Sequence, residues 1–246
     1  TTGWELEDRG VDLVVAAALT DVAGPRISVR PVAGMPLMYV SYPSIKGTKA
    51  LSKRVLDVVG ATAALLLLWP LMLVVALLVK LDSPGPVLFK QQRIGMNGKP
   101  FQIVKFRSMK VDAEEHVNEL LAHAEGDGPL IKFRDDPRIT RLGRVLRKYS
   151  LDELPQFFNV LKGNMSLVGP RPQDPREVDE YEDHVRRRLR VKPGITGLVQ
   201  VSGRSDLDWD EYVRLDLSYV ENWSMTSDLA ILAKTFGAVI GGKGSY

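Results

Sequence analysis

The sequence predicts a mixed α/β fold that includes a membrane-associated helical segment, and three observations support this prediction. An uncharged apolar run occupies residues 58–79. At about 1.5 Å per residue such a helix is roughly 33 Å long, enough for a bilayer core. Apolar and polar residues alternate over residues 101–106, as expected of a half-buried strand. Apolar residues recur at helical spacing through residues 140–158, so the same chain contains both helices and strands.

The composition is that of a globular protein that fills one large domain or two small ones. The chain has 246 residues, of which 45% are hydrophobic and 26% charged, and its formal net charge is +3. It contains no cysteine, which fits a reducing compartment facing the cytoplasm and excludes disulfides and thiolate metal sites. Its histidines are scattered, so neither a histidine metal site nor a catalytic triad is expected.

Positive charge is concentrated in two clusters, one within residues 134–148 and the other within residues 186–192. Neither cluster is interleaved with aromatic residues that could stack on bases, and no nucleic-acid-binding motif accompanies them. We therefore predict no nucleic acid partner. A phosphate-bearing substrate or an anionic lipid is the expected partner.

The first part of the chain has the pattern of the end of an α/β domain. The chain begins without Met and shows no signal peptide, so we expect a fragment of a longer protein. Val11–Ala18 and Ile27–Val32 are apolar runs on either side of a Gly-Pro turn, and both are typical of strands. The stretch 45–49 is predicted to be a linker. We therefore expect a boundary between residues 1–46 and residues 47–246.

Two features of the apolar run argue against a straight crossing of the membrane. Pro70 follows Trp69 in the middle of the run, where it removes a backbone hydrogen bond and favours a kink or break. Both flanks are basic, with Lys53 before the run and Lys80 after it, whereas a spanning helix carries positive charge mainly on its cytoplasmic side. We expect a re-entrant helix-break-helix. A plain transmembrane helix and a buried core helix remain alternatives.

Shorter patterns follow the apolar run. A turn over residues 82–86 ends it, a hairpin loop is predicted over residues 91–99, and a strand over residues 101–106. The acidic residues Asp112 and Glu115 open a predicted helix, where they are more typical of surface charges than of metal ligands. The remaining predictions are a helix with a cationic face over 140–149, a strand over 198–201, and helices over 209–219 and 223–240.

The span Arg147–Pro172 is the candidate active site, because it combines adjacent carboxylates, basic residues and a rigid Gly-Pro-Arg-Pro turn. Asp152 and Glu153 are bracketed by apolar residues, which places them beside a core face. A simpler interpretation is a capping box, in which Ser150 is the N-cap and the acids match the helix dipole. The cations before the acids, and Arg171 after them, favour a polyanionic phosphate substrate with a divalent metal.

Several ordered motifs in this chain are similar to those of a known family. They are KRVLDVVGATAALLLLWPLMLVVALLVKLDSPGPVLFKQQRIG, KFRSM, DPRITRLGRVLRKYS, SLDELPQFFNVLKGNMSLVGPRP and KPGITGLVQVSGR. Together they resemble the bacterial sugar transferase family, the monotopic polyprenyl-phosphate phosphoglycosyl transferases of the long, exopolysaccharide-initiating type. The resemblance covers about residues 50–246.

The resemblance implies a fold and its boundaries. Residues 47–246 would form a small membrane-associated catalytic domain, with a re-entrant membrane hairpin over residues 58–79. Residues 1–46 would be the C-terminal part of a Rossmann-like domain. The family's hairpin is broken at a Ser-Pro pair, whereas this chain has Trp69 and Pro70 there, so a hydroxyl that could bond to freed backbone groups is missing.

The resemblance also implies roles for individual residues. Asp152 corresponds to the family's nucleophile and Glu153 to the second acid of its Asp-Glu pair, and the two would bind Mg²⁺. Arg147 and Arg171 would contact phosphate. Three further residues are expected at the substrate: Lys105, Arg107 and Arg204.

The implied activity is transfer of a sugar-1-phosphate from a UDP-sugar to undecaprenyl phosphate, with release of UMP through a covalent intermediate on Asp152. It would begin the synthesis of an exopolysaccharide, a capsule or an O-antigen. The implied location is the bacterial inner membrane, with the active site on the cytoplasmic face, and a homo-oligomer remains open. The sequence does not determine the sugar. A membrane-anchored scaffold whose basic patches only hold anionic lipid is the alternative.

Overall fold

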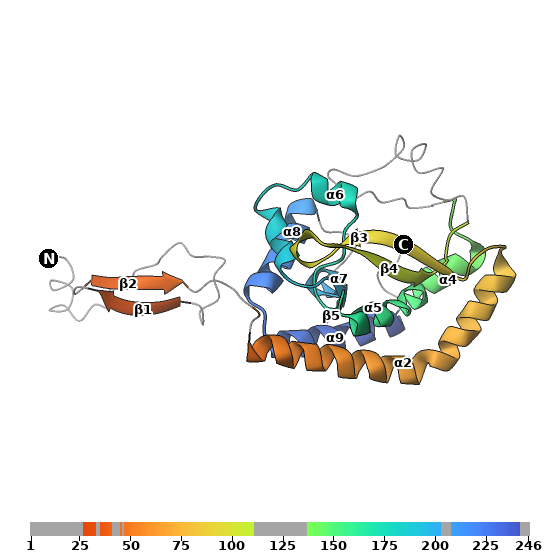
Figure 1. Ribbon diagram of the computed structural model, residues 1–246, viewed down its shortest axis with the longest axis horizontal. Coiled ribbons are helices and arrows are strands. Elements are labelled where there is room, and N and C mark those ends of the chain that lie inside the picture. The colour runs from red at the N-terminus through yellow and green to blue at the C-terminus, as the bar shows by residue number, and fades with distance from the viewer. Residues whose placement is uncertain are drawn as a thin grey trace. The chain divides into compact units, whose positions relative to one another are not determined.

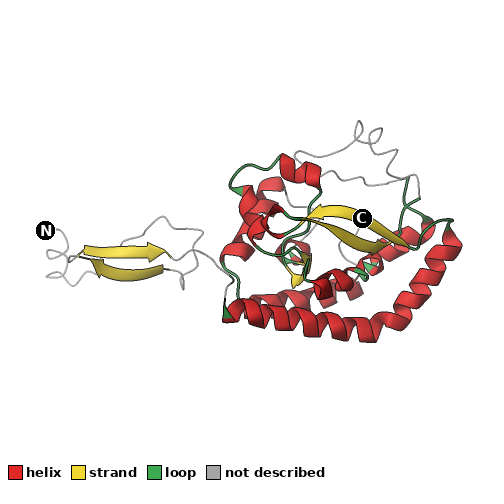
Figure 2. Cartoon of the chain, in the orientation of Figure 1, coloured by secondary structure: helices red, strands yellow, loops and turns green. Residues whose placement is uncertain are grey.

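The computed structural model describes residues 27–32, 35–40, 45, 47–110, 137–202 and 208–241 (Figure 2). The chain divides into two units, Thr1–Tyr42 and Pro43–Tyr246. The boundary lies close to the one predicted from the linker at residues 45–49. Two sequence-predicted segments, Val11–Ala18 and the acidic helix with Asp112 and Glu115, lie outside the described residues.

The described part of the first unit is an antiparallel hairpin. Strand β1, Ile27–Val32, pairs with strand β2, Met35–Val40, with Ile27 opposite Val40. The predicted strand over residues 27–32 is confirmed, whereas β2 was not predicted. A hairpin of this kind does not by itself indicate a Rossmann-like domain, so that interpretation stays a prediction.

The second unit mixes helices with short strands, in agreement with the predicted α/β class (Figure 1). A long helix, α2, runs along one side of the unit, the β3–β4 hairpin lies on the other side, and α9 lies beside the first part of α2. In chain order the elements are α2 Thr48–Asp82, β3 Leu88–Ile94, η2 Met96–Gly98, β4 Pro100–Phe106, α4 Arg141–Lys148, η3 Leu151–Glu153, α5 Gln156–Lys162, β5 Ser166–Val168, α6 Pro175–Asp179, η4 Val185–Arg190, β6 Gly194–Thr196, α7 Leu198–Val201, α8 Trp209–Glu221 and α9 Met225–Gly241.

The β3–β4 hairpin is longer than the sequence predicted. Leu88 pairs with Phe106 and Ile94 with Pro100, so residues 91–94 belong to β3 and not to the predicted loop. The turn itself is short, and Asn97 adopts a left-handed conformation with φ of 59°. Asparagine tolerates this region better than most residues because its short polar side chain can bond locally. The predicted strand over residues 101–106 is confirmed.

The strand predicted over residues 198–201 is wrong, because these residues form helix α7. The strand lies just before it, as β6, and pairs in parallel with β5 through Ser166–Gly194 and Val168–Thr196. A Cβ on Gly194 would lie 2.1 Å from the backbone nitrogen of Gly169, so the close pairing requires glycine here. An apolar run of four residues carries no usable period, which is why the sequence did not distinguish strand from helix.

Helix α2 is a single helix with Pro70 inside it, so of the kink or break predicted at Pro70 the break is not observed. Instead the helix bends part-way along its length (Figure 1). A proline lacks the N–H for one helical bond and crowds the preceding turn, so a bend without an end to the helix is a common result.

The apolar surface of α2 is mostly exposed. Of its most apolar 18-residue window only 11% is buried, and Leu67, for example, is 78% exposed. By length and composition the helix can cross a membrane. The alternative of a buried core helix is therefore excluded. One stripe, including Ala61, Val75 and Val79, packs against the rest of the unit.

Two buried charged residues attach the first part of α2 to strand β5. Lys53 Nζ donates to the carbonyl of Val168 at 3.0 Å and to Asp228 Oδ2 at 2.6 Å. Asp57 Oδ1 accepts hydrogen bonds from Ser166 Oγ at 2.8 Å and from the backbone N–H of Leu167 at 2.9 Å. Lys53 was predicted to be a flanking charge beside the membrane, and the structure corrects this, because Lys53 is buried in an ion pair with α9.

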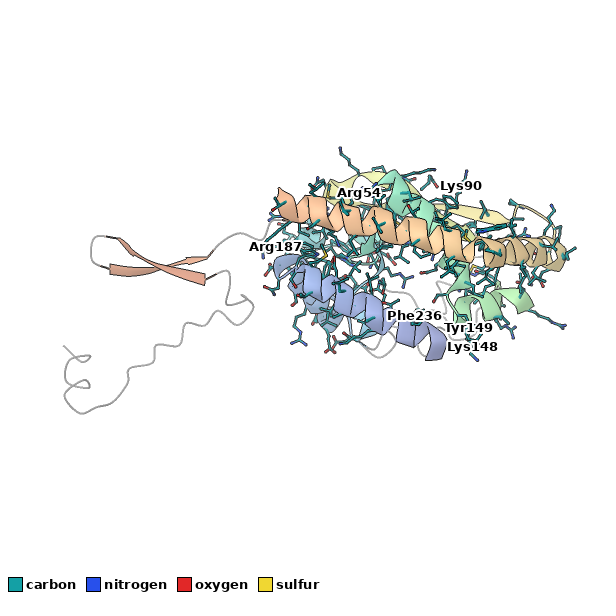
Figure 3. All side chains as sticks on the ribbon, turned by 90° about the horizontal axis from the view of Figure 1, so that it is seen from below. Arg54, Lys90, Lys148, Tyr149, Arg187 and Phe236 are labelled. Carbon is teal, nitrogen blue, oxygen red and sulfur yellow. The ribbon has the colours of Figure 1, made fainter. Side chains whose placement is uncertain are left out.

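Helix α9 has one packed side and one exposed side. Asp228 and Ile231 are buried, whereas Leu229 is exposed and Phe236 is 72% exposed. Figure 3 shows α9 next to α2 on the same face of the unit. The sequence left open whether this helix packs in the core or reaches a membrane. The structure is compatible with both, because one side of the helix is packed and the other side is exposed.

The re-entrant topology can be tested by single-cysteine labelling, because the chain has no native cysteine. Lys49 and Lys80 flank the apolar run and are both exposed, which makes them better sites than the buried Lys53. In a re-entrant hairpin, Lys49→Cys and Lys80→Cys should both react with a membrane-impermeant maleimide from the cytoplasmic side. Labelling of the two positions from opposite sides of the membrane would establish a spanning helix instead.

Candidate active site

The helix before the acidic pair, α4, is held tightly against the end of strand β4. Thr140 caps it, since its Oγ1 accepts a hydrogen bond from the N–H of Gly143 at 2.9 Å. A Cβ on Gly143 would lie 2.0 Å from the carbonyl oxygen of Ser108, so glycine allows the close approach. The predicted helix and its exposed cationic face of Arg141, Arg144 and Lys148 are confirmed.

The acidic pair lies on a short 3₁₀ turn, η3, between α4 and α5. Ser150, the residue before this turn, has a left-handed conformation with φ of 53°, which changes the direction of the chain. Its side chain makes no capping hydrogen bond. The capping-box interpretation is therefore wrong, and the acids are not in the first turn of an α-helix. A non-glycine residue with positive φ is uncommon and is often found where a site fixes the backbone.

Asp152 is buried, with 6% of its surface exposed, and Glu153 is half-buried beside it. Glu153 Oε1 lies 2.9 Å from Lys105 Nζ, which comes from strand β4. Burial raises the pKa of Asp152, and the charge of Glu153 raises it further, while Lys105 and Arg147 oppose the shift. The ionised form of Asp152 is thus unfavourable at this position, and a further cation would stabilise it.

A cleft lies beside Glu153 and is lined by residues from distant parts of the chain, whereas the buried Asp152 is not part of its lining. It brings together three of the predicted residues, Glu153, Lys105 and Arg171. Arg147 is placed close to Asp152, and its Nε donates to Ser108 Oγ at 3.1 Å. The full lining is Arg93, Ile103, Lys105, Glu153, Gln156, Arg171, Pro172, Gly194, Ile195 and Gln200.

The Pro-Arg-Pro turn that carries Arg171 is fixed by backbone hydrogen bonds on both sides. The carbonyl of Pro170 accepts from the N–H of Gly194 at 2.9 Å, and the carbonyl of Gln173 accepts from the N–H of Ile94 at 3.0 Å. Arg171 itself is exposed at the cleft. Its position is therefore set by β6 on one side and by the end of β3 on the other.

Arg107 is placed differently from the prediction that it faces the substrate. Its guanidinium is buried and donates to the carbonyls of Pro84 at 2.5 Å, Ser83 at 2.7 Å and Val79 at 3.4 Å. Val79 belongs to the last turn of α2, where the last backbone acceptors have no helical partner, and Ser83 and Pro84 directly follow the helix. Lys105 and Arg107 flank the buried Phe106 in the sequence, yet only Lys105 lines the cleft.

Sequence reasoning missed three polar residues of the cleft: Arg93, Gln156 and Gln200. Arg93 had been assigned to the hairpin loop. If β3 had been extended to Ile94, the alternation would have placed Arg93 on the inner side of the hairpin, together with Phe89 and Gln91. The predicted substrate residue Arg204 lies outside the described residues, so its role stays a prediction.

Residues 48–242 match the family described as "Bacterial sugar transferase". The chain belongs to this family. It is 42% identical to "Galactosyl transferase CpsE" of Streptococcus agalactiae over 236 residues, which are 96% of this chain and 52% of that protein. It is 42% identical to "Exopolysaccharide production protein ExoY" of Rhizobium meliloti over 224 residues, 89% of this chain and 92% of that protein.

A third sugar transferase relative has a more explicit name. The chain is 41% identical to "UDP-glucose:undecaprenyl-phosphate glucose-1-phosphate transferase" of Escherichia coli over 221 residues, 87% of this chain and 45% of that protein. The chain thus spans about half the length of two of these three relatives and nearly all of the other. The family predicted from the motifs is confirmed.

The placement of Arg107 predicts a structural effect. Arg107→Met should lower the free energy of unfolding by about 1.5–3 kcal/mol, because hydrogen bonds from a charged donor to the end of α2 are lost. Thermal or urea unfolding of the detergent-solubilised protein measures this. Arg144→Met, which removes an exposed arginine of α4, is the matched control and should have little effect. Equal stability of the two variants would contradict the anchoring role.

The raised pKa of Asp152 predicts that Asp152→Asn stabilises the metal-free protein at neutral pH. The ionised carboxylate is less favourable in the folded than in the unfolded chain, so stability falls as pH rises from the unfolded-state to the folded-state pKa. The gain in thermal midpoint should be present at pH 7.5 and shrink as pH falls towards 4. Asp179→Asn, at an exposed aspartate, is the control. A lower midpoint for Asp152→Asn at pH 7.5 would refute the prediction.

Proposed function

We propose that this sugar transferase moves a sugar-1-phosphate from a UDP-sugar to undecaprenyl phosphate and releases UMP, at the start of exopolysaccharide, capsule or O-antigen synthesis. The observation that supports this best is the buried Asp152 beside Glu153, with Lys105 and Arg147 close to Asp152 and with Arg171 in the cleft that Glu153 lines. The names of the relatives agree with this proposal, since that of the Escherichia coli protein specifies UDP-glucose and undecaprenyl phosphate.

The reaction would proceed in two displacements at the phosphorus bonded to the sugar. In the first, an Asp152 carboxylate oxygen forms a bond to this phosphorus, the bond to the bridging oxygen breaks, and its electron pair leaves with UMP. In the second, an oxygen of undecaprenyl phosphate attacks the same phosphorus and Asp152 leaves. A covalent intermediate divides one difficult displacement into two easier ones.

The cations near Asp152 would supply the electrostatic stabilisation that phosphoryl transfer requires. Lys105 reaches the cleft from β4 and is aligned by its ion pair with Glu153. Arg147 is oriented by its hydrogen bond to Ser108. Fixed cations at the equatorial phosphate oxygens offset developing charge without a reorganisation cost during the reaction.

The donor set is compatible with Mg²⁺. Among the described residues no group of three or more acidic or histidine side chains could hold a metal ion. Mg²⁺, however, is often bound by one or two carboxylates together with substrate phosphates and water, and Asp152 and Glu153 offer such a pair. Bound there, it would neutralise phosphate charge. Glu153 then has two candidate roles, as a metal ligand or as a base towards the acceptor.

The exposed apolar surface of α2 explains how such a site could meet a lipid acceptor. The helix would enter the inner membrane from the cytoplasmic side and hold the cleft at the level of the headgroups. The exposed cations of α4 would face anionic lipid. The relatives are named for galactose and for glucose, and no residue of the cleft decides between them.

The covalent role of Asp152 predicts a burst. With Mg²⁺ and the correct UDP-sugar, but without undecaprenyl phosphate, about one equivalent of UMP should be released per active site. Mass spectrometry should locate the sugar-phosphate adduct on the peptide that contains Asp152, and added undecaprenyl phosphate should discharge it. Asp152→Asn should abolish burst and turnover, whereas a scaffold protein would show neither in the wild type.

Lys105→Met provides a graded comparison in the same assay. Loss of a charge-assisted contact to phosphate oxygens should slow adduct formation by roughly ten- to a hundredfold. Lys90→Met, an exposed lysine on the neighbouring strand, is the control. If the complete reaction runs but no UMP appears without acceptor, transfer is direct and Asp152 is not the nucleophile.

A further inference from the structure

Arg93 is a cleft residue to which neither the sequence motifs nor the family comparison gives a role. It lies near the end of β3, and its side chain is only 18% exposed. It is nevertheless part of the cleft lining, together with Arg171, Lys105 and Glu153. A guanidinium that is largely buried in a cleft needs an anionic partner to compensate for its lost hydration.

The groups around Arg93 compensate only in part for the hydration that its guanidinium loses on burial. One hydrogen bond within 3 Å is formed, from Nη2 to Gln91 Oε1 at 2.7 Å. The carboxylates of Asp174 and Glu177 lie 3.7 and 4.0 Å from Nη1, which is beyond hydrogen-bonding distance. These acids hold the guanidinium in place by charge while they leave its donors available for a ligand.

A second arginine increases the demand for an anion. The end of β3 is bridged to the segment after the Pro-Arg-Pro turn through Ile94 and Gln173, which brings Arg93 close to Arg171. Burial and the neighbouring charge of Arg171 lower the pKa of Arg93. Two guanidinium groups that face one cleft repel each other, and a phosphate between them would remove this repulsion.

The cations of the site therefore form two groups. Lys105 forms an ion pair with Glu153 at 2.9 Å, and Arg147 lies close to Asp152. Arg93 and Arg171 form the second group, and the carboxylates that lie beside Arg93 are those of Asp174 and Glu177, at 3.7 and 4.0 Å. A nucleotide diphosphate has two phosphates, so one cation group can serve the phosphate that Asp152 attacks and the other the phosphate that leaves.

We propose that Arg93, paired with Arg171, binds the uridine-side phosphate of the UDP-sugar and stabilises it as UMP leaves. This inference rests on the proposed function and assigns a new residue to its donor site. Arg93 thus acts in the first displacement. It has no role in the second, because UMP has left before undecaprenyl phosphate attacks the adduct on Asp152.

The test separates the two displacements in the full-length chain in detergent or nanodiscs. Arg93→Met should slow the UMP burst at least tenfold and weaken inhibition by UMP by about the same factor. Adduct formed slowly by this variant, freed of nucleotide by desalting, should be discharged by undecaprenyl phosphate at the wild-type rate. Arg93→Lys keeps a positive charge but loses the planar guanidinium. Its burst rate and its inhibition by UMP should lie between those of the wild type and of Arg93→Met.

The control is Lys90→Met, which removes a cation from an exposed position of the same strand (Figure 3) and should match the wild type in both half-reactions. Thermal shifts with UMP and with uridine separate a phosphate contact from a base contact. The wild type should prefer UMP over uridine, and the preference should shrink in Arg93→Met.

Three outcomes would overturn the assignment. They are an unchanged burst with unchanged UMP inhibition, an equal slowing of both half-reactions with a lowered thermal midpoint, and an undiminished preference for UMP over uridine. Failure of the proposed function would look different, because the wild type itself would then form no adduct. The comparison of UMP with uridine binding would still report on Arg93.

Discussion

The attachment of helix α2 to the body of the protein is the constraint on which the rest of the structure depends. An apolar helix with most of its surface exposed cannot be positioned by hydrophobic packing alone, since that would leave its rotation and depth poorly determined. Lys53 and Asp57 fix its first part to β5 by buried hydrogen bonds, and Arg107 fixes its end to β4. Buried polar contacts of this kind are directional and define a single arrangement.

The strands that hold α2 are also the strands that position the cleft. Strand β4 carries Lys105 at the acidic pair, and Arg107, directly after the strand, contacts the end of α2. The last carbonyl of strand β5 accepts a hydrogen bond from Lys53, and the chain then enters the turn that carries Arg171. The distance of the cleft from the apolar helix is therefore set by two short strands. This connection is what the proposed reaction between a nucleotide sugar and a membrane lipid would require.

Electrostatic strain is concentrated in the same region. Asp152 is buried next to Glu153, and Arg93 is largely buried next to Arg171, so both like-charge pairs destabilise the protein without a ligand. A polyanion with a divalent cation would relieve both. The favourable interactions with this ligand would then lie where charge develops during the reaction. This arrangement is expected of an enzyme and not of an inert scaffold.

Local pattern determined much of this protein from the sequence. The helical period predicted α4, α8 and the apolar α2, and the resemblance of the motifs predicted the family. The same motifs indicated Asp152 and Glu153 as the candidate acidic pair. These features depend on residues close together in the chain, so periodicity, caps and motif spacing were sufficient.

Tertiary structure decided the features that depend on distant partners. Lys105 and Arg107 are two residues apart, yet one side chain reaches the cleft and the other contacts the end of α2, because Lys105 lies within β4 and Arg107 lies just beyond its end. Arg93 reaches the cleft only because the end of β3 is bridged to the segment after the Pro-Arg-Pro turn. Charge and composition show that an arginine needs an anion, but only the packing of the strands decides which one it meets.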